Sequence, residues 1–436
     1  MLKRILCGVM ARLVTGGGAM GEALTCVRAP GVAALVDEWG VERVENGRYD
    51  DLFAVREGEL YAAGSRGAYW LLDAEGTVLN DAPFAMIDDA GVALVFRRGA
   101  FFGAMDGAGN ETVPAEWTQL VCDGLGGFLA LDGDPTDDTP DEIVHISASG
   151  EVTPTGVAVA RGLSPVKAGR MPFVTADGLY GAVDAGGSIA IEPTWRYIGA
   201  FDAGLAKARG DGGMGLIDAD GHDVIAPVYD WLERSGAMIA AGGDGRVDVY
   251  GIDGEWRYNI EAVDAEASLV GEYLAVYAPG GSALYDAAGA VIAERGAGTT
   301  FAPGASGQVV ATDGEWGEAC QYLIDPDGSD ASGPFQQLLP LCEGRYAYLQ
   351  MAGVEYYSEE LGRIKKSWDY AGARYGLADD RGNVVLPAEY REIIPAGADR
   401  LALVGDDGVT LVDPGGNIVR AWATVEAGSA TGAVGA

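Results

Sequence analysis

Carboxylate-rich loops are the part of this sequence whose residue types and spacing could bind an ion. The densest one is residues 132–142, which contain five aspartates and one glutamate. Alternating oxygen ligands of this kind are typical of calcium loops. The order of an EF-hand loop is not kept, because counting from Asp132 places Ile143 where the bidentate glutamate belongs. We therefore expect a solvated acidic loop between strands and leave calcium binding at 132–142 open.

The sequence offers few other groups for catalysis or cofactor binding. His145 and His222 are the two histidines, and the five cysteines form no Cys-x-x-Cys pair, so a zinc site has almost no ligands. Neither a Gly-x-Ser-x-Gly elbow nor a glycine-rich phosphate loop occurs. Among 65 acidic residues, any choice of two for glycoside hydrolysis would be arbitrary. We expect no enzyme activity, no metal and no cofactor.

The charge of the chain narrows the classes of partner. A formal net charge of −36 would repel the phosphate backbone of nucleic acid, and it would attract a basic protein surface. No apolar run approaches the roughly 18 residues that a membrane-spanning helix needs. We expect no nucleic-acid partner and no transmembrane segment.

Compartment and disulfide bonding stay open. Residues 1–30 begin like a signal peptide, with Lys3 and Arg4 before an apolar run, but Arg12 interrupts the run and three glycines follow it. Exported or cell-envelope and cytoplasmic locations are both compatible with this segment. Cys320 and Cys342 fall within one predicted repeat and could pair in an exported protein, or each could pack as a buried free thiol.

The architecture that must position these residues is a tandem repeat. An apolar triplet leads into an aspartate, and a glycine follows three residues later. Most intervals between these glycines measure 33 to 41 residues. The complete copies begin at Asp37, Asp73, Asp106, Asp184, Asp218, Asp286, Asp325, Asp379 and Asp413. With degenerate copies near Ser147 and Asp253, there are about eleven units, and the spacing fails at 345–372.

Each unit contains the signals of four short antiparallel strands. The aspartate can accept backbone N–H groups and the glycine supplies a positive φ, so Asp-x-x-Gly predicts a hairpin turn and not an ion site. A proline then marks the edge or end of the second strand, and an aromatic residue is expected to begin the third. Copies of this order include Pro114 with Trp117, Pro193 with Trp195, and Pro387 with Tyr390.

These residues resemble the WG (KWG) repeat family. Its units run aromatic-Gly, two apolar residues, Asp-x-x-Gly and then a segment with proline and an aromatic residue. The clearest copy runs from Tyr180-Gly181 through Asp184 and Pro193 to Trp195, and others begin at Met214-Gly215 and Tyr375-Gly376. The resemblance implies a bacterial β-repeat protein and supplies no catalytic residues.

Together these patterns predict an all-β array over residues 31–436, preceded by a leader or poorly structured segment at 1–30. Eleven units exceed the usual four to eight blades of a propeller, so we expect propeller-like blades in two rings, or an open β-superhelix. The expected function is a non-catalytic scaffold that binds a protein or a surface glycan, with a cell-wall or carbohydrate-binding module as the alternative. Tyr356, Tyr357 and Trp368, in the irregular insertion, are the candidate ligand-binding residues, with local packing as the competing interpretation.

Overall fold

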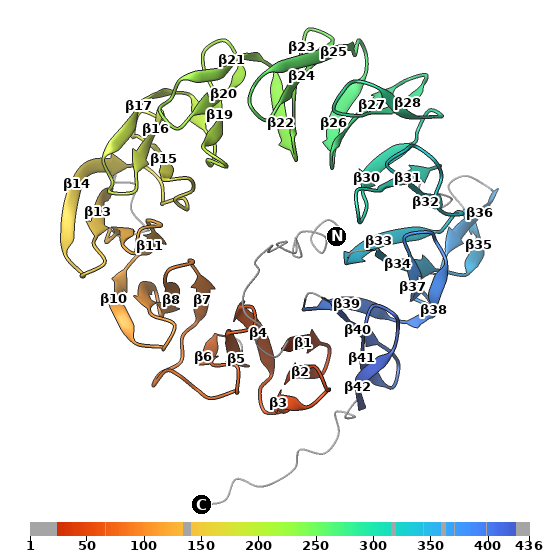
Figure 1. The fold of residues 1–436 in the computed structure, drawn as a ribbon, viewed down its shortest axis with the longest axis horizontal. Helices are drawn as coiled ribbons and strands as arrows, with labels where there is room; N and C mark the ends of the chain where they lie inside the picture. The colour runs from red at the N-terminus through yellow and green to blue at the C-terminus, as the bar shows by residue number, and fades with distance from the viewer. Residues whose placement is uncertain are drawn as a thin grey trace, which may run out of the picture.

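The chain folds into one ring of eleven small antiparallel sheets, the blades of a β-propeller (Figure 1). This computed structural model describes residues 24–65, 67–133, 141–314, 320–342, 344–358, 363–369, 371–397 and 399–423, and it contains strands and turns without helices over those ranges. The prediction of an all-β array of blades is confirmed. The expectation of two rings or an open superhelix is wrong, because the last blade packs directly on the first.

The blades are numbered in chain order. Blades 1 to 4 contain β1 (Thr25–Ala29), β2 (Val32–Val36) and β3 (Glu42–Val44); β4 (Asp51–Arg56), β5 (Leu60–Ser65) and β6 (Ala68–Leu72); β7 (Met86–Asp89), β8 (Leu94–Arg98), β9 (Phe101–Met105) and β10 (Glu111–Trp117); β11 (Gln119–Cys122), β12 (Phe128–Leu131), β13 (Asp141–Ile146) and β14 (Val152–Val159). Blades 5 to 8 contain β15 (Arg170–Val174), β16 (Tyr180–Asp184) and β17 (Ile189–Trp195); β18 (Tyr197–Ile198), β19 (Leu205–Arg209), β20 (Met214–Asp218) and β21 (Asp223–Tyr229); β22 (Trp231–Ser235), β23 (Met238–Gly243), β24 (Arg246–Gly251) and β25 (Trp256–Glu261); β26 (Glu266–Val270), β27 (Tyr273–Ala278), β28 (Gly281–Tyr285) and β29 (Val291–Arg295). Blades 9 to 11 contain β30 (Thr300–Pro303), β31 (Val309–Asp313) and β32 (Cys320–Ile324); β33 (Gln337–Cys342), β34 (Arg345–Gln350), β37 (Arg374–Asp379) and β38 (Val384–Tyr390); β39 (Glu392–Ala396), β40 (Arg400–Val404), β41 (Gly408–Val412) and β42 (Ile418–Ala423).

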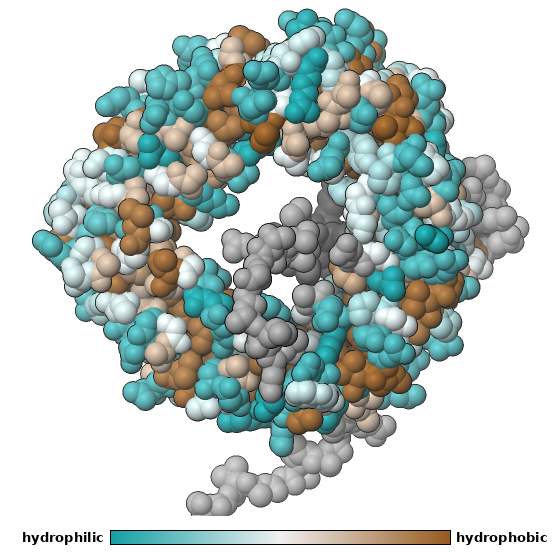
Figure 2. Space-filling model, viewed as in Figure 1, coloured by the Kyte–Doolittle hydropathy of each residue, from teal (hydrophilic) through white to brown (hydrophobic). Residues whose placement is uncertain are grey.

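The hydrophobic core is divided among the interfaces between blades. Because side chains alternate along a strand, each middle strand covers two neighbours. In β2, Val32, Ala34 and Val36 face blade 11, whereas Ala33 and Leu35 face blade 2. Eleven buried clusters result, and each joins two successive blades. An opening through the middle of the ring is visible in Figure 2.

The sequence unit and the blade are out of phase. In blades 5, 6 and 10, the aromatic-Gly pair or its Met-Gly equivalent lies at the start of the last strand but one, which is β16, β20 or β37. The segment with proline forms the outermost strand of the blade. The expectation that the aromatic residue begins the next strand is wrong, since Trp195 ends β17 and pairs with Tyr180. A bulge around Pro193 lengthens the outer strand so that this pairing is reached. One sequence unit therefore supplies the outer half of one blade and the inner half of the next.

Successive strands in a blade are antiparallel, so the connections alternate between the two faces of the ring. We call the turn face the side that carries the Asp-x-x-Gly turns. We call the connector face the opposite side, which carries the segments that join the blades.

Two features depart from the regular ring. β1 starts at Thr25, within the segment that the sequence analysis assigned to 1–30. In blade 10, β34 pairs directly with β37, and the intervening chain forms a separate hairpin of β35 (Gly353–Ser358) and β36 (Arg363–Trp368). This hairpin lies on the connector face, in the interval where the repeat spacing fails.

Candidate functional site

The Asp-x-x-Gly turns use their carboxylates internally. In the last copy, Asp413 Oδ1 accepts the backbone N–H groups of Gly415 and Asn417, each at 2.9 Å, and Gly416 has a φ of 83°. In seven other turns the aspartate Oδ1 likewise accepts the backbone N–H groups of the residues two and four positions later. These aspartates are Asp37, Asp73, Asp106, Asp184, Asp218, Asp286 and Asp379. One carboxylate oxygen in each of these eight turns is thus committed to the backbone, which supports the interpretation of these tetrapeptides as turns.

Metal and disulfide chemistry can be assessed for part of the chain. Over the described ranges, no group of three or more histidine, cysteine, aspartate or glutamate side chains is placed to hold a metal ion. Most of the acidic loop at 132–142 falls outside those ranges, so calcium binding there stays a prediction. Cys320 is a free thiol at the start of β32 in blade 9, and Cys342 ends β33 in blade 10, so the two do not form a disulfide.

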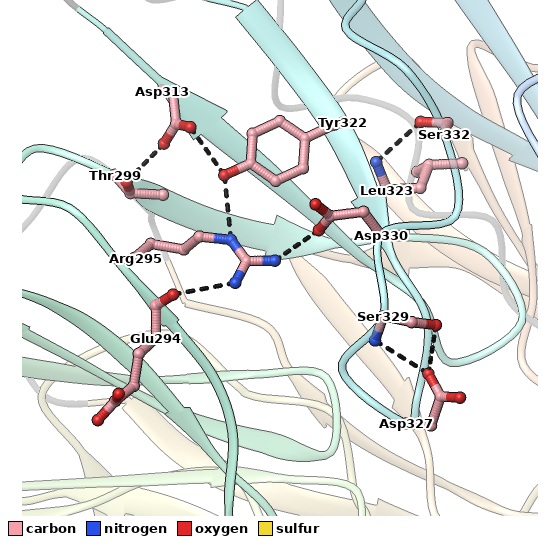
Figure 3. Close-up of polar contacts among 10 residues, drawn as sticks. All are labelled: Glu294, Arg295, Thr299, Asp313, Tyr322, Leu323, Asp327, Ser329, Asp330 and Ser332. Atoms are coloured by element: carbon pink, nitrogen blue, oxygen red, sulfur yellow. Dashed lines mark hydrogen bonds and ion pairs between the residues drawn. The ribbon is translucent and has the colours of Figure 1, made fainter.

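Tyrosine, arginine and aspartate meet in a polar network between blades 8 and 9 (Figure 3). Arg295 Nε donates to the Tyr322 hydroxyl at 3.2 Å, and Tyr322 donates to Asp313 Oδ2 at 2.8 Å. Arg295 also donates to Asp330 at 2.5 Å, and Thr299 donates to the other oxygen of Asp313. Burial, together with the hydrogen bond to Asp313, raises the pKa of Tyr322 to about 12. Tyr322 is thus a neutral phenol whose hydrogen-bond partners are protein side chains. It links blades 8 and 9 and is unsuited to act as a base.

The turn face is tied together by a repeated contact that we call the clasp. A long polar side chain at or just before the start of β15, β31, β34 or β40 donates to a backbone carbonyl in the Asp-x-x-Gly turn of the next blade. The clasps are Arg170 to Ala219 O at 2.7 Å, Gln308 to Asp380 O at 2.7 Å, Arg345 to Pro414 O at 2.5 Å, and Arg400 to Glu38 O at 3.1 Å. The side chains of Arg170, Gln308, Arg345 and Arg400 are consequently occupied in holding neighbouring blades together.

The predicted binding residues lie on the inserted hairpin. Trp368 faces Gly353 across the base of the hairpin, and Tyr356 and Tyr357 pair with Lys365 and Ile364 farther along it. The side chains of residues 355–358 and 363–367 are outside the described part of the structure. Gln336 fixes the start of the hairpin by donating to Met351 O at 3.0 Å. Whether the three aromatic residues bind a ligand stays a prediction.

A pocket that the sequence analysis missed lies on the connector face between blades 7 and 8. Its volume is about 430 Å³, and its wall combines Trp231 with the carboxylates of Asp230, Glu233, Asp244 and Glu266. The residues come from β22, β26, the turn after β23 and the connection after β25. No single motif gathers them, and each fits an ordinary turn or strand end, so the sequence carries no signal that would have joined them.

Comparison with known protein families supports the repeat. Residues 180–212 match the family described as WG containing repeat, which confirms the predicted resemblance for that unit. The match spans the outer strands of blade 5 and the inner strands of blade 6. No curated protein sequence matches the chain.

Solved structures give distant similarities. A structure titled as the eukaryotic initiation factor has 11% identity and a TM-score of 0.41, and the alignment covers 66% of this chain and 85% of that one. For BamB from Moraxella catarrhalis the identity is 16% and the TM-score 0.28, with 60% and 88% covered. For Hsv2 from Kluyveromyces lactis these values are 7%, 0.30, 60% and 98%. Similarities at this level carry no argument about function.

Proposed function

We propose that this protein is a non-catalytic scaffold that binds a protein partner through the connector face of its ring. The observation that carries the proposal is the difference between the two faces. On the turn face, the clasps join neighbouring blades, and carboxylates of the Asp-x-x-Gly turns are hydrogen-bonded within their own turns. The connector face carries the inserted hairpin and the pocket between blades 7 and 8. Binding residues concentrate on irregular loops that a rigid scaffold holds in place.

The chemistry of the described residues agrees with a binding role. Burial raises the pKa values of Tyr258, Tyr322 and Tyr346 to about 12, which moves these phenols further from acting as bases near neutral pH. No helix long and apolar enough to cross a membrane occurs in the described ranges. The carbohydrate-binding alternative gains no specific observation, since the exposed tryptophans of the described ranges, Trp39 and Trp256, lie on blades 1 and 7 and form no shared platform.

Co-purification tests the proposal. The tagged full chain is expressed in the cells that naturally make it, purified at moderate salt, and the retained proteins are identified and recombined with the pure chain. We expect a protein that binds again in a defined stoichiometry. A chain that recovers as a monomer with nothing bound would contradict the proposal, and retention on a polysaccharide matrix that soluble sugar competes would favour the carbohydrate-binding alternative.

A further inference from the structure

The pocket between blades 7 and 8 has the size and position of a ligand site. At about 430 Å³ it falls in the range of roughly 300 to 1,000 Å³ that is usual for such sites. It opens at the inner rim of the connector face, since β22 and β26 are the innermost strands of their blades (Figure 1).

Small residues keep this pocket open. Gly243 and Gly245 form one side, and Ala262, Ala265 and Ala267 form the other. The turn between the two glycines is tight, with positive φ values of 53° at Asp244 and 72° at Gly245. Larger side chains on these positions would fill the space that the wall encloses.

One aromatic ring is held rigidly in the wall. A Cβ added to Gly242 would lie 2.3 Å from the ring of Trp231, so the glycine allows the indole to pack flat against the backbone of β23. Trp231 is only partly buried, which leaves part of its ring available to the pocket. A fixed indole is the preferred partner for a cation that stacks on an aromatic face.

The charges of the wall favour a positive ligand. Glu233 accepts the backbone N–H of Leu269 at 3.0 Å, which ties its position to blade 8. Asp230, Asp244 and Glu266 are exposed, and no cationic side chain in the described ranges forms an ion pair with them. An anionic ligand would be repelled by this wall.

Arg246 also lines the pocket, but its guanidinium is paired with a different carboxylate from those of the wall. Arg246 contacts the buried Asp248 at 2.7 Å, and this hydrogen bond raises the pKa of the guanidinium. Trp256 Nε1 and the Tyr229 hydroxyl also donate to Asp248, so that carboxylate is fully engaged. Arg246 is thus already paired, and the negative charge of the other wall residues remains.

We propose that this pocket binds a lysine or arginine side chain from a basic segment of the protein partner, with Trp231 stacking on the cation and Asp230, Asp244 and Glu266 surrounding it. The inference rests on the proposed scaffold function and gives it a partner chemistry. The net charge of −36 would steer such a segment toward the ring, and the pocket would select where it docks.

The test measures binding of a fluorescently labelled hexa-arginine peptide to the full chain by anisotropy, at about 0.15 M salt where the screening length is about 8 Å. The pocket variant carries Asp230→Asn, Asp244→Asn and Glu266→Gln. The matched control carries Glu45→Gln, Asp177→Asn and Asp407→Asn, three exposed carboxylates of the same face that lie on other blades. Both triple variants change the net charge equally.

We expect the pocket variant to weaken binding by about tenfold or more and the control by less than about twofold, because only the first removes close charge partners of the bound cation. Equal losses in the two triple variants, or no binding by the unaltered chain, would overturn the proposal. Two variants without a change in charge guard against a folding defect. Trp231→Phe weakens the aromatic contact and Ala265→Leu fills the cavity, so each is expected to reduce affinity severalfold, and unchanged affinity in both would also overturn it.

Failure of this inference can be told apart from failure of the scaffold function. If the partner recovered by co-purification binds the pocket variant and the unaltered chain equally well, the scaffold function stands and the pocket assignment falls.

Discussion

Arg400, at the start of β40 in the last blade, donates to the backbone carbonyl of Asp37 in the first blade at 3.0 Å. Its second nitrogen donates to Glu38 O at 3.1 Å, and the side chain is 9% exposed. Within the described ranges, no blade combines strands from the two ends of the chain. This contact, the hydrogen bonds from Arg420 and Trp422 to blade 1, and the apolar cluster at the same interface therefore close the ring. The closing interface repeats the clasp that Arg170 makes between blades 5 and 6.

Removing the closing clasp is expected to weaken the closure of the ring. Arg400→Met keeps much of the side-chain volume but removes the Arg400 donor to Glu38 O and one of the two donors to Asp37 O, which should lower the free energy of unfolding by about 1.5–3 kcal/mol. Arg170→Met, in the interior of the array, is the control and should cost a similar amount. Small-angle X-ray scattering should show an increased radius of gyration for Arg400→Met alone. Unchanged stability and unchanged dimensions in Arg400→Met would contradict this account of closure.

The glycine of the aromatic-Gly pair is required for packing. A Cβ on Gly181 would lie 2.6 Å from Ile191 O, at the bulge of the outer strand, and 2.9 Å from the Phe173 ring. Gly181→Ala should therefore lower the free energy of unfolding by about 1–3 kcal/mol, measured by denaturant titration. Gly280→Ala is the control, since a Cβ there meets nothing within 4 Å and should change stability by less than about 0.5 kcal/mol. Equal effects at both positions would show that this close approach does not matter.

The turns should contribute to acid sensitivity. Burial alone would raise the pKa of the Asp413 carboxyl, but hydrogen bonds from the Asn417 side chain and from backbone N–H groups outweigh it and lower the pKa below 3.8. Stabilisation by this group is then complete above pH 3.8 and is lost as the pH falls through the folded-state pKa. Asn at this position can accept the same N–H groups without titrating.

The stability difference between the unaltered chain and Asp413→Asn should therefore shrink as the pH falls from about 6 to about 3, in thermal melts at constant ionic strength. Asp407→Asn removes an exposed carboxylate outside any such turn, so it serves as the control for net charge. A difference that stays constant for Asp413→Asn over this range would contradict the role assigned to the turn carboxylate.

The inserted hairpin should be dispensable for folding. β34 and β37 pair directly, and β35 and β36 pair only with each other. Replacing residues 353–368 with a short Gly-Ser turn should leave the thermal midpoint within about 2 °C of the original, since little of the core is touched. Weaker binding of the co-purified partner would assign the hairpin to the interface. A large loss of stability would instead show that Tyr356, Tyr357 and Trp368 pack against the blade.

Local signals predicted much of this fold. Asp-x-x-Gly turns and their spacing identified the strands, the number of units and the WG resemblance, because these depend on residues close in sequence. Closure into one ring could not be predicted, since Arg400 and Asp37 are 363 positions apart. The pocket could not be predicted from the sequence for a similar reason. Trp231, Asp244 and Glu266 are ordinary residues of their own strands and turns, and only the packing of two blades brings them together.

Site-specific photo-crosslinking tests most directly the claim that the connector face binds the partner. A benzoylphenylalanine replaces Val263 on the connector face, where the side chain is 68% exposed, or Trp39 on the turn face, where it is 66% exposed. We expect the co-purified partner to be crosslinked from position 263 and not from position 39. Crosslinking from position 39 alone would contradict the assignment of the connector face.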